Sequence, residues 1–567
     1  MEQGVIMKQE IEIKEEKIEP SNTTLADDTQ VLENLNIEQE NFEDLSLKNE
    51  LETLERDLGI KHEFFFDDSH WNLNHLKRSS AMEASQIYRS STAQGHNNTS
   101  EIVIEGGSDI DIFECEDIDD ETANAVISDE CDEKDNEEDD DDPPMLHQNE
   151  GQRRKPVWRK VRGGQGSERQ VPEWLGHHAN DDGDGAEIRN PIVYFRRFFT
   201  CELLDNITSQ SNLYATQKDA NKTLNLTKNE LEQFIGSLMW MSILKLSNTR
   251  SYWRGHMANL LVAKVFSRDR WETIKSNLHF NDNTYMPDRN GPNFDNLYKI
   301  RPIISSLKEI FRAIPMTSRL CIHEQMVPFK GRSCLKRYIL SKPHKCGFKL
   351  FILSDVYGMV YDFEVYTGKI LPVSNRPDLG ASSNIVIQLA ECIPDGLNFQ
   401  LYFDNWFTPL PLLVHLAKRQ IYSIGTIRSN RLQGADLIND KALQAKGRGA
   451  YEEKETTIDD VRIRAVKWHD SRAVILVSTF ASAEPLIDCQ RYEKRRKENV
   501  TIPKPNIVDQ YNSFMGGVEL LHQLIALYRI QVSSKKYYHK FFFHFIDMAV
   551  VNSWLLYRRD CDKYGVQ

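Results

Sequence analysis

Residues 401–408 constrain the fold of this chain more than any other segment. They read Leu-Tyr-Phe-Asp-Asn-Trp-Phe-Thr, an apolar run that ends on Asp404 and passes into an aromatic turn. An apolar run of this length, rich in aromatic residues and bounded by turn residues, favours a buried strand over residues 398–403. A carboxylate at the end of such a strand suits metal-dependent phosphodiester chemistry, so Asp404 is the first candidate site residue.

Two further motifs accompany this segment. Residues 319–332 contain Ile322-His323-Glu324-Gln325, and residues 508–523 contain Tyr511-Asn512, Gly516-Gly517-Val518-Glu519 and His522. In this order and spacing, the three segments resemble the catalytic core of piggyBac-type transposases. That family has I-D-E-Q, then D-N-W/F-F-T, then Y-N-x-x-x-G-G-V-D-x-x-D, and the resemblance extends over residues 190–560.

The resemblance implies four acidic catalytic and metal-binding positions, two of which are histidines in this chain. Asp404 is retained, Glu519 is a conservative replacement, and His323 and His522 replace carboxylates. The family activity implies Mg²⁺, which prefers oxygen ligands, so imidazole is a poor substitute. Glu324 faces away from His323 because neighbouring strand residues point to opposite faces, whereas Asp355 is a possible surrogate.

Residues 519 and 522 are three apart on a predicted helix and therefore share one face. If that face meets the strand ends, two imidazoles and two carboxylates converge, which predicts a site for Zn²⁺ at His323, Asp404, Glu519 and His522. The alternative is drift of a site that no longer serves catalysis and holds no cofactor. The sequence favours this second alternative.

Charge is divided unevenly along the 567 residues. Residues 1–142 carry 42 acidic and 10 basic side chains, or −32, and the whole chain carries −15, so residues 143–567 carry +17. A basic body suits a polyanionic partner, and the alternative is an ordinary Lys/Arg surface. The resemblance implies that the partner is DNA and that the location is the nucleus. The nine cysteines form no C-x-x-C pair, which predicts no zinc finger, and no apolar run is suited to spanning a membrane.

The pattern predicts an α/β protein in five parts. A disordered acidic tail covers residues 1–150, and a helical dimerisation and DNA-binding domain, a role implied by the resemblance, covers 151–315. An RNase H-like core follows over 316–430 and returns over 506–560. A β-rich insertion over 431–505 divides it.

Two segments mix basic and aromatic side chains, as phosphate-binding surfaces do. They predict DNA contacts from six residues: Arg495, Arg496, Lys497, Lys535, Lys536 and Lys540. The alternative is a charged loop for the first segment and helix packing for the second, through Tyr537 and Tyr538.

The sequence thus predicts a piggyBac transposase-derived, dimeric DNA-binding protein that has lost strand cleavage because His323 and His522 replace carboxylates. One alternative is an active DDE-type transposase that performs metal-dependent cleavage and strand transfer. A second alternative is a chromatin or protein interaction scaffold. Assays of DNA cleavage and of salt-dependent DNA binding distinguish these three hypotheses.

Overall fold

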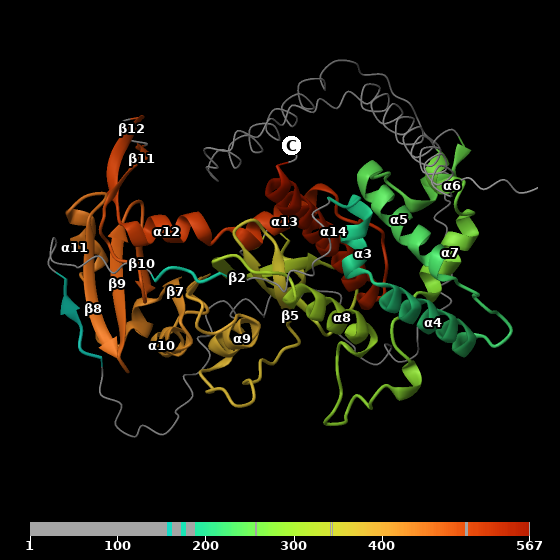
Figure 1. The fold of residues 1–567 in the computed structure, drawn as a ribbon, viewed down its shortest axis with the longest axis horizontal. Coiled ribbons are helices and arrows are strands. Elements are labelled where there is room, and N and C mark those ends of the chain that lie inside the picture. The colour runs from blue at the N-terminus through green and yellow to red at the C-terminus, as the bar shows by residue number, and fades with distance from the viewer. Residues whose placement is uncertain are drawn as a thin grey trace, which may run out of the picture. The chain divides into compact units, whose positions relative to one another are not determined.

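The computed structural model describes residues 156–161, 172–176, 188–255, 258–340, 342, 344–493 and 497–565. The expected acidic tail of residues 1–150 lies outside them, as do Arg495 and Arg496. The chain divides into two compact units, Met1–Thr122 and Ala123–Gln567, and every described residue belongs to the second. Figure 1 shows the helices and strands of this part.

Five strands form the centre of a mixed sheet in the order β5-β4-β2-β6-β7. Strand β2 pairs antiparallel with β4, which pairs antiparallel with β5, whereas β2, β6 and β7 run parallel. Their bounds are β2 Arg319–Pro328, β4 Cys346–Asp355, β5 Val360–Val365, β6 Phe399–Phe403 and β7 Ile421–Thr426. This order is that of an RNase H-like core, which confirms the predicted fold class.

The predicted β-rich insertion continues this same sheet. Strand β10 pairs with β7, β9 with β10 and β8 with β9, all antiparallel. The bounds are β8 Tyr451–Ile458, β9 Val461–His469 and β10 Ala473–Ser478, while β11 Ile487–Glu493 and β12 Glu498–Lys504 form a separate two-stranded ribbon. The short strand β3, Lys336–Tyr338, pairs with β4.

The segment before the helical part belongs with the sheet. Strand β1, Arg159–Lys160, pairs with Glu455 and Lys454 of β8, so its backbone satisfies an otherwise open sheet edge. Further along, the Trp174 ring packs edge-on against Phe399 of β6 at 5.9 Å. The helical part therefore begins near residue 190 rather than at residue 151.

Helices dominate from there to residue 312, as the apolar spacing predicts. Asn190 and Thr227 cap the first turns of α3 and α5 by accepting hydrogen bonds from the amides of Ile192 and Glu230. The buried Trp271 ring packs beside Phe234 at 5.3 Å. The helices are α3 Pro191–Phe198, α4 Cys201–Lys218, α5 Lys228–Leu244, α6 Leu260–Ala263, α7 Arg268–Asn277 and α8 Arg301–Arg312.

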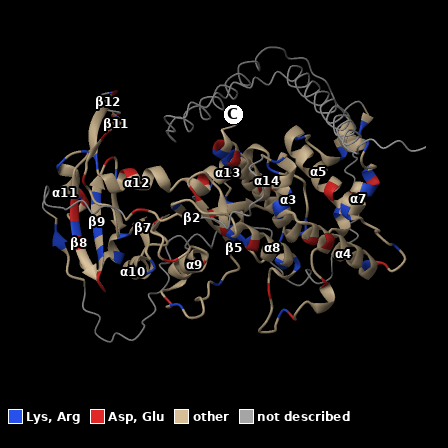
Figure 2. Cartoon of the chain, viewed as in Figure 1, with Lys and Arg blue, Asp and Glu red and all other residues tan. Residues whose placement is uncertain are grey.

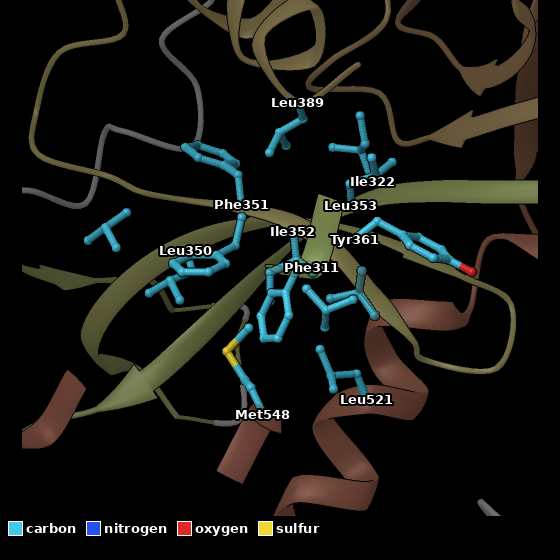
Figure 3. Close-up of a cluster of buried hydrophobic side chains, with 14 of the residues drawn as sticks. Phe311, Ile322, Leu350, Phe351, Ile352, Leu353, Tyr361, Leu389, Leu521 and Met548 are labelled. Atoms are coloured by element: carbon cyan, nitrogen blue, oxygen red, sulfur yellow. The ribbon is translucent and has the colours of Figure 1, made fainter. Parts of the chain in front are cut away.

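Helices also cover the sheet. Figure 3 shows Leu389 of α9 on one side of β4, and Leu521 of α13 with Met548 of α14 on the other. The remaining helices are α9 Ala381–Ala390, α10 Leu410–Lys418, α11 Asp440–Ala445, α12 Asn506–Phe514, α13 Gly517–Leu527 and α14 Tyr537–Tyr564. In the described part of the chain, no helix has the length and apolar character needed to cross a membrane.

Candidate active site

Three of the predicted site residues meet because of the strand register. His323 lies in the middle of β2, directly after Ile322, which pairs with Phe403 at the end of the parallel strand β6. Asp404 follows Phe403, so it lies beside His323 at the same level of the sheet. Glu519 comes from the first turn of α13, which packs on β2 and β4.

The His323 ring stands between the two carboxylates. Its Nε2 atom lies 3.0 Å from Oε1 of Glu519, and its Nδ1 atom lies 3.5 Å from Oδ2 of Asp404. Nδ1 is buried and makes no hydrogen bond within the described residues, so its contact with Asp404 is electrostatic only. The ammonium of Lys342 lies 3.2 Å from Nε2. The site therefore contains two basic and two acidic side chains.

Electrostatics favour an imidazolium at this position. Burial and the nearby Lys342 charge lower the pKa of His323, but the hydrogen bond and charge of Glu519 outweigh them, so the pKa is raised above 6.5. Burial raises the pKa of Glu519, and the His323 bond and charge reverse this and lower it. Burial raises the pKa of the Asp404 carboxyl, although the His323 charge opposes the shift. The strongest pair is thus His323 with Glu519.

The aromatic turn after β6 fixes Asp404. Its Oδ1 atom accepts a hydrogen bond from the Trp406 amide at 2.9 Å, and its carbonyl accepts one from the Thr408 hydroxyl at 2.6 Å. The Trp406 ring stacks on Phe351 at 5.6 Å. An Asp side chain that bonds the amide two residues on closes a tight turn, so this motif also has a structural role.

The Gly516-Gly517 pair lets α13 approach the sheet. A Cβ atom at Gly517 would collide with the Asp355 carbonyl and meet the Cys321 sulfur at 2.8 Å. Only glycine permits this contact between the helix start and strands β2 and β4. The close approach is what brings Glu519 within reach of His323.

His522 does not join the other three. No hydrogen bond or ion pair among the described residues links it to His323 or Asp404, and its ring lies 5.9 Å from that of His344. Burial, followed by the charges of Arg529 and His344, lowers the pKa of His522 to about 4. The predicted convergence of four residues is therefore replaced by a convergence of three.

Neither Glu324 nor Asp355 takes the place of the carboxylate that His323 replaces. Glu324 lies 2.6 Å from the Lys349 ammonium and, as alternation requires, projects from the face of β2 opposite His323. Asp355 pairs with Leu320 rather than with residue 323, and its carboxylate accepts hydrogen bonds from the amides of Tyr357 and Met359. Its role is to close the β4–β5 turn.

The donors do not fit a two-magnesium centre. Such a centre needs several carboxylates between the ions, and here the imidazole ring takes the space between Asp404 and Glu519. Within the described ranges, no three His, Cys, Asp or Glu side chains form a group that could hold a metal ion. Oε2 of Glu519 is buried without a hydrogen-bond partner among the described residues, but one free carboxylate oxygen does not supply an octahedral shell.

The predicted DNA-contacting lysines differ in their surroundings. Lys497 lies exposed at the turn between β11 and β12, and Lys535 is exposed before α14. Lys536 instead donates to the Ser276 carbonyl at 2.8 Å, and Lys540 is half-buried. Figure 2 shows basic and acidic positions interspersed over the helices and strands.

The tyrosines beside these lysines pack within the protein. Tyr538 is buried, and the Tyr537 hydroxyl donates to the Asn296 carbonyl at 3.0 Å. The packing alternative is confirmed for both. The sequence reasoning missed Lys342, whose only local signal is its place in the basic segment Lys-Pro-His-Lys before β4.

Comparison with known proteins agrees with this fold. The family model described as "Transposase IS4" matches residues 190–554. PiggyBac transposable element-derived protein 3 of Homo sapiens is 30% identical over 381 residues, which are 66% of this chain and 62% of that protein. PiggyBac transposable element-derived protein 2 of Homo sapiens is 29% identical over 383 residues, 66% of this chain and 63% of that protein. The matched region thus spans less than two thirds of either relative.

A solved structure shows the same fold. The cryo-EM structure of a piggyBac transposase synaptic complex with hairpin DNA aligns with a TM-score of 0.56 at 21% identity, covering 67% of this chain and 77% of that one. The sheet order and this likeness define the class as a protein with an RNase H-like core. This chain belongs to the IS4/piggyBac-type transposase family, whose curated relatives are transposable element-derived proteins.

Proposed function

We propose that this chain is a transposase-derived DNA-binding protein that does not cleave DNA strands. The observation that carries the proposal is the His323 ring between Asp404 and Glu519, with Nε2 3.0 Å from Oε1 of Glu519. In metal-dependent phosphoryl transfer, carboxylates hold two cations that activate the nucleophile and stabilise the leaving oxygen. Here an imidazole ring lies between the two remaining carboxylates, in place of the carboxylate that such a centre needs.

Charge supports the DNA-binding half of the proposal. Residues 143–567 carry a formal +17, and a basic body of this kind attracts a polyanion. The solved structure that shares the fold is a DNA complex. Exposed lysines such as Lys497 and Lys535 suit phosphate contacts. DNA as partner implies the nucleus as location, and a homodimer follows from the proposed kinship with transposases that synapse DNA ends.

A paired assay tests both halves. Full-length protein is mixed with supercoiled plasmid, and with duplexes that carry terminal repeats of related elements, in Mg²⁺ or Mn²⁺. We expect binding that weakens steeply as salt increases and no nicking or hairpin product. Metal-dependent cleavage by the wild type that Asp404→Ala abolishes would instead establish an active transposase. Absence of any salt-dependent DNA binding would favour an interaction scaffold.

A further inference from the structure

A group of basic side chains gathers beside the candidate active site. It is formed by Lys342, His344, His522, Arg529 and Lys540, and is called the basic cluster below. Lys342 and His344 precede β4, His522 lies on α13, Arg529 follows α13, and Lys540 lies in the first turn of α14. Two regions of the chain, residues 342–344 and 522–540, therefore bring basic side chains to one place.

Direct contacts link three of the five side chains. Nε2 of His344 lies 3.2 Å from Nη1 of Arg529, and the rings of His344 and His522 lie 5.9 Å apart. Burial, followed by the charges of Arg529 and Lys540, lowers the pKa of His344, which places Lys540 within electrostatic reach. Burial lowers the pKa of Lys540 and the Arg529 charge adds to this shift, so the proximity of these two cations is unfavourable by itself.

Carboxylates balance the cluster only in part, through a 4.0 Å contact between Lys342 and Glu324. Among the described residues, neither Arg529 nor Lys540 forms an ion pair. The nearest acid, Asp547, is buried and accepts a hydrogen bond from the Ile530 amide at 3.2 Å. Glu519 is already paired with His323. The cluster therefore has donors and positive charge in excess of acceptors.

Two buried donors near the cluster lack acceptors. Nε of Arg529 has no hydrogen-bond partner among the described residues. Nε2 of Gln325 is also buried and unpartnered, and Gln325 is 2% exposed. Its Oε1 atom lies 2.8 Å from Nε2 of the buried His544. Because buried donors are costly when unpaired, two of them beside excess positive charge indicate a site for an external acceptor.

We propose that the basic cluster binds a phosphate group. A tetrahedral oxyanion with several acceptor atoms can take hydrogen bonds from Arg529, His522 and Lys540 at once, and Arg is well matched to phosphate. An acid at position 522 would instead pair with Arg529 and His344 internally. The histidine leaves these donors for a ligand. The phosphate comes either from a DNA backbone or from a free phosphate compound, and the first source rests on the proposed function.

Pyrophosphate and duplex DNA distinguish the two sources. Binding of each to the full-length protein is measured by calorimetry and melting temperature, with sodium chloride at equal ionic strength as the reference. The variants are Arg529→Gln, Lys540→Gln and His522→Asp, and the control Lys446→Gln removes one exposed positive charge from the end of α11. We expect pyrophosphate, but not chloride, to raise the wild-type melting temperature.

Each variant of the cluster should bind pyrophosphate at least about tenfold more weakly, since charge-assisted hydrogen bonds are lost, and Lys446→Gln should match the wild type. If the same variants also bind duplex DNA more weakly, the phosphate belongs to DNA. If DNA binding is unchanged, the site takes a free phosphate compound. A wild type that binds pyrophosphate but no DNA overturns the proposed function and supports the site. Equal pyrophosphate binding by wild type and the two folded variants Lys540→Gln and His522→Asp overturns the site.

Discussion

Nε2 of His323 lies 3.0 Å from Oε1 of Glu519, while Nδ1 of the same ring faces Asp404 at 3.5 Å. The His323 ring thus lies between the two side chains that are still acidic at the family's acidic positions. A protonated ring would place one positive charge between the two carboxylates. This relationship accounts for two half-buried carboxylates beside one histidine, in a chain whose other two acidic family positions are histidines.

Restoring carboxylates should restore metal affinity. We expect Mg²⁺ or Mn²⁺ to leave the wild-type melting temperature unchanged and to raise that of His323→Asp, because carboxylates at positions 323, 404 and 519 then face one another. The control is His323→Asn, which removes the imidazole but adds no charge. Thermal denaturation with and without metal measures the effect. An equal shift in the wild type would contradict the account.

Acid should destabilise the fold through a buried histidine. Burial, followed by the Lys536 charge, lowers the pKa of His539 to about 3, and its ring bonds the Leu278 carbonyl. Unfolding lets this group bind a proton near its ordinary pKa of 6.5, so stability is unaffected above 6.5 and falls as pH decreases below it. The loss is roughly 1.4 kcal/mol per pH unit until the pH approaches 3. In urea titrations, His539→Gln should reduce this slope, and an unchanged slope would argue against a neutral buried ring.

Gly517 should tolerate no side chain. In Gly517→Ala, the methyl group would meet the Asp355 carbonyl and the Cys321 sulfur, so α13 must shift. Overpacking of this kind costs about 1–3 kcal/mol or more. Gly236→Ala is the control, because a Cβ there meets nothing within 4 Å on helix α5, where alanine is favoured. Chemical denaturation should show a large loss for the first and a small gain for the second, and similar values would refute the close approach.

A buried ion pair should hold α8 against the core. The fully buried Asp362 of β5 lies 2.7 Å from Nη2 of Arg312 and 3.4 Å from Nζ of Lys308. Asp362→Asn leaves these cations without their counter-charge, which costs about 3–5 kcal/mol for a buried pair. Asp459→Asn, which breaks the exposed pair with Lys418, should cost about 1 kcal/mol or less. Equal losses in urea unfolding would mean that the pair does not anchor the helix.

Local signals in the sequence were enough to locate the core strands and the caps at Asn190 and Thr227, because apolar runs and capping residues act within a few residues. The meeting of His323, Asp404 and Glu519 was instead expected from the family resemblance. The pairing of β1 with β8 joins segments almost 300 positions apart, and a two-residue strand has no periodicity to detect. The separation of His522 from the site likewise depends on Arg529 and His344, whose proximity only tertiary packing sets.

The measurement that tests the central claim most directly is the pKa of His323 in the folded protein. Histidine ring carbons are labelled, the His323 signal is assigned by its loss in His323→Gln, and pH is titrated by NMR. The account predicts a pKa above 6.5 that decreases in Glu519→Gln, because the partner charge is then removed. A wild-type pKa at or below 6.5, or a value indifferent to Glu519→Gln, would contradict an imidazolium held between the two carboxylates.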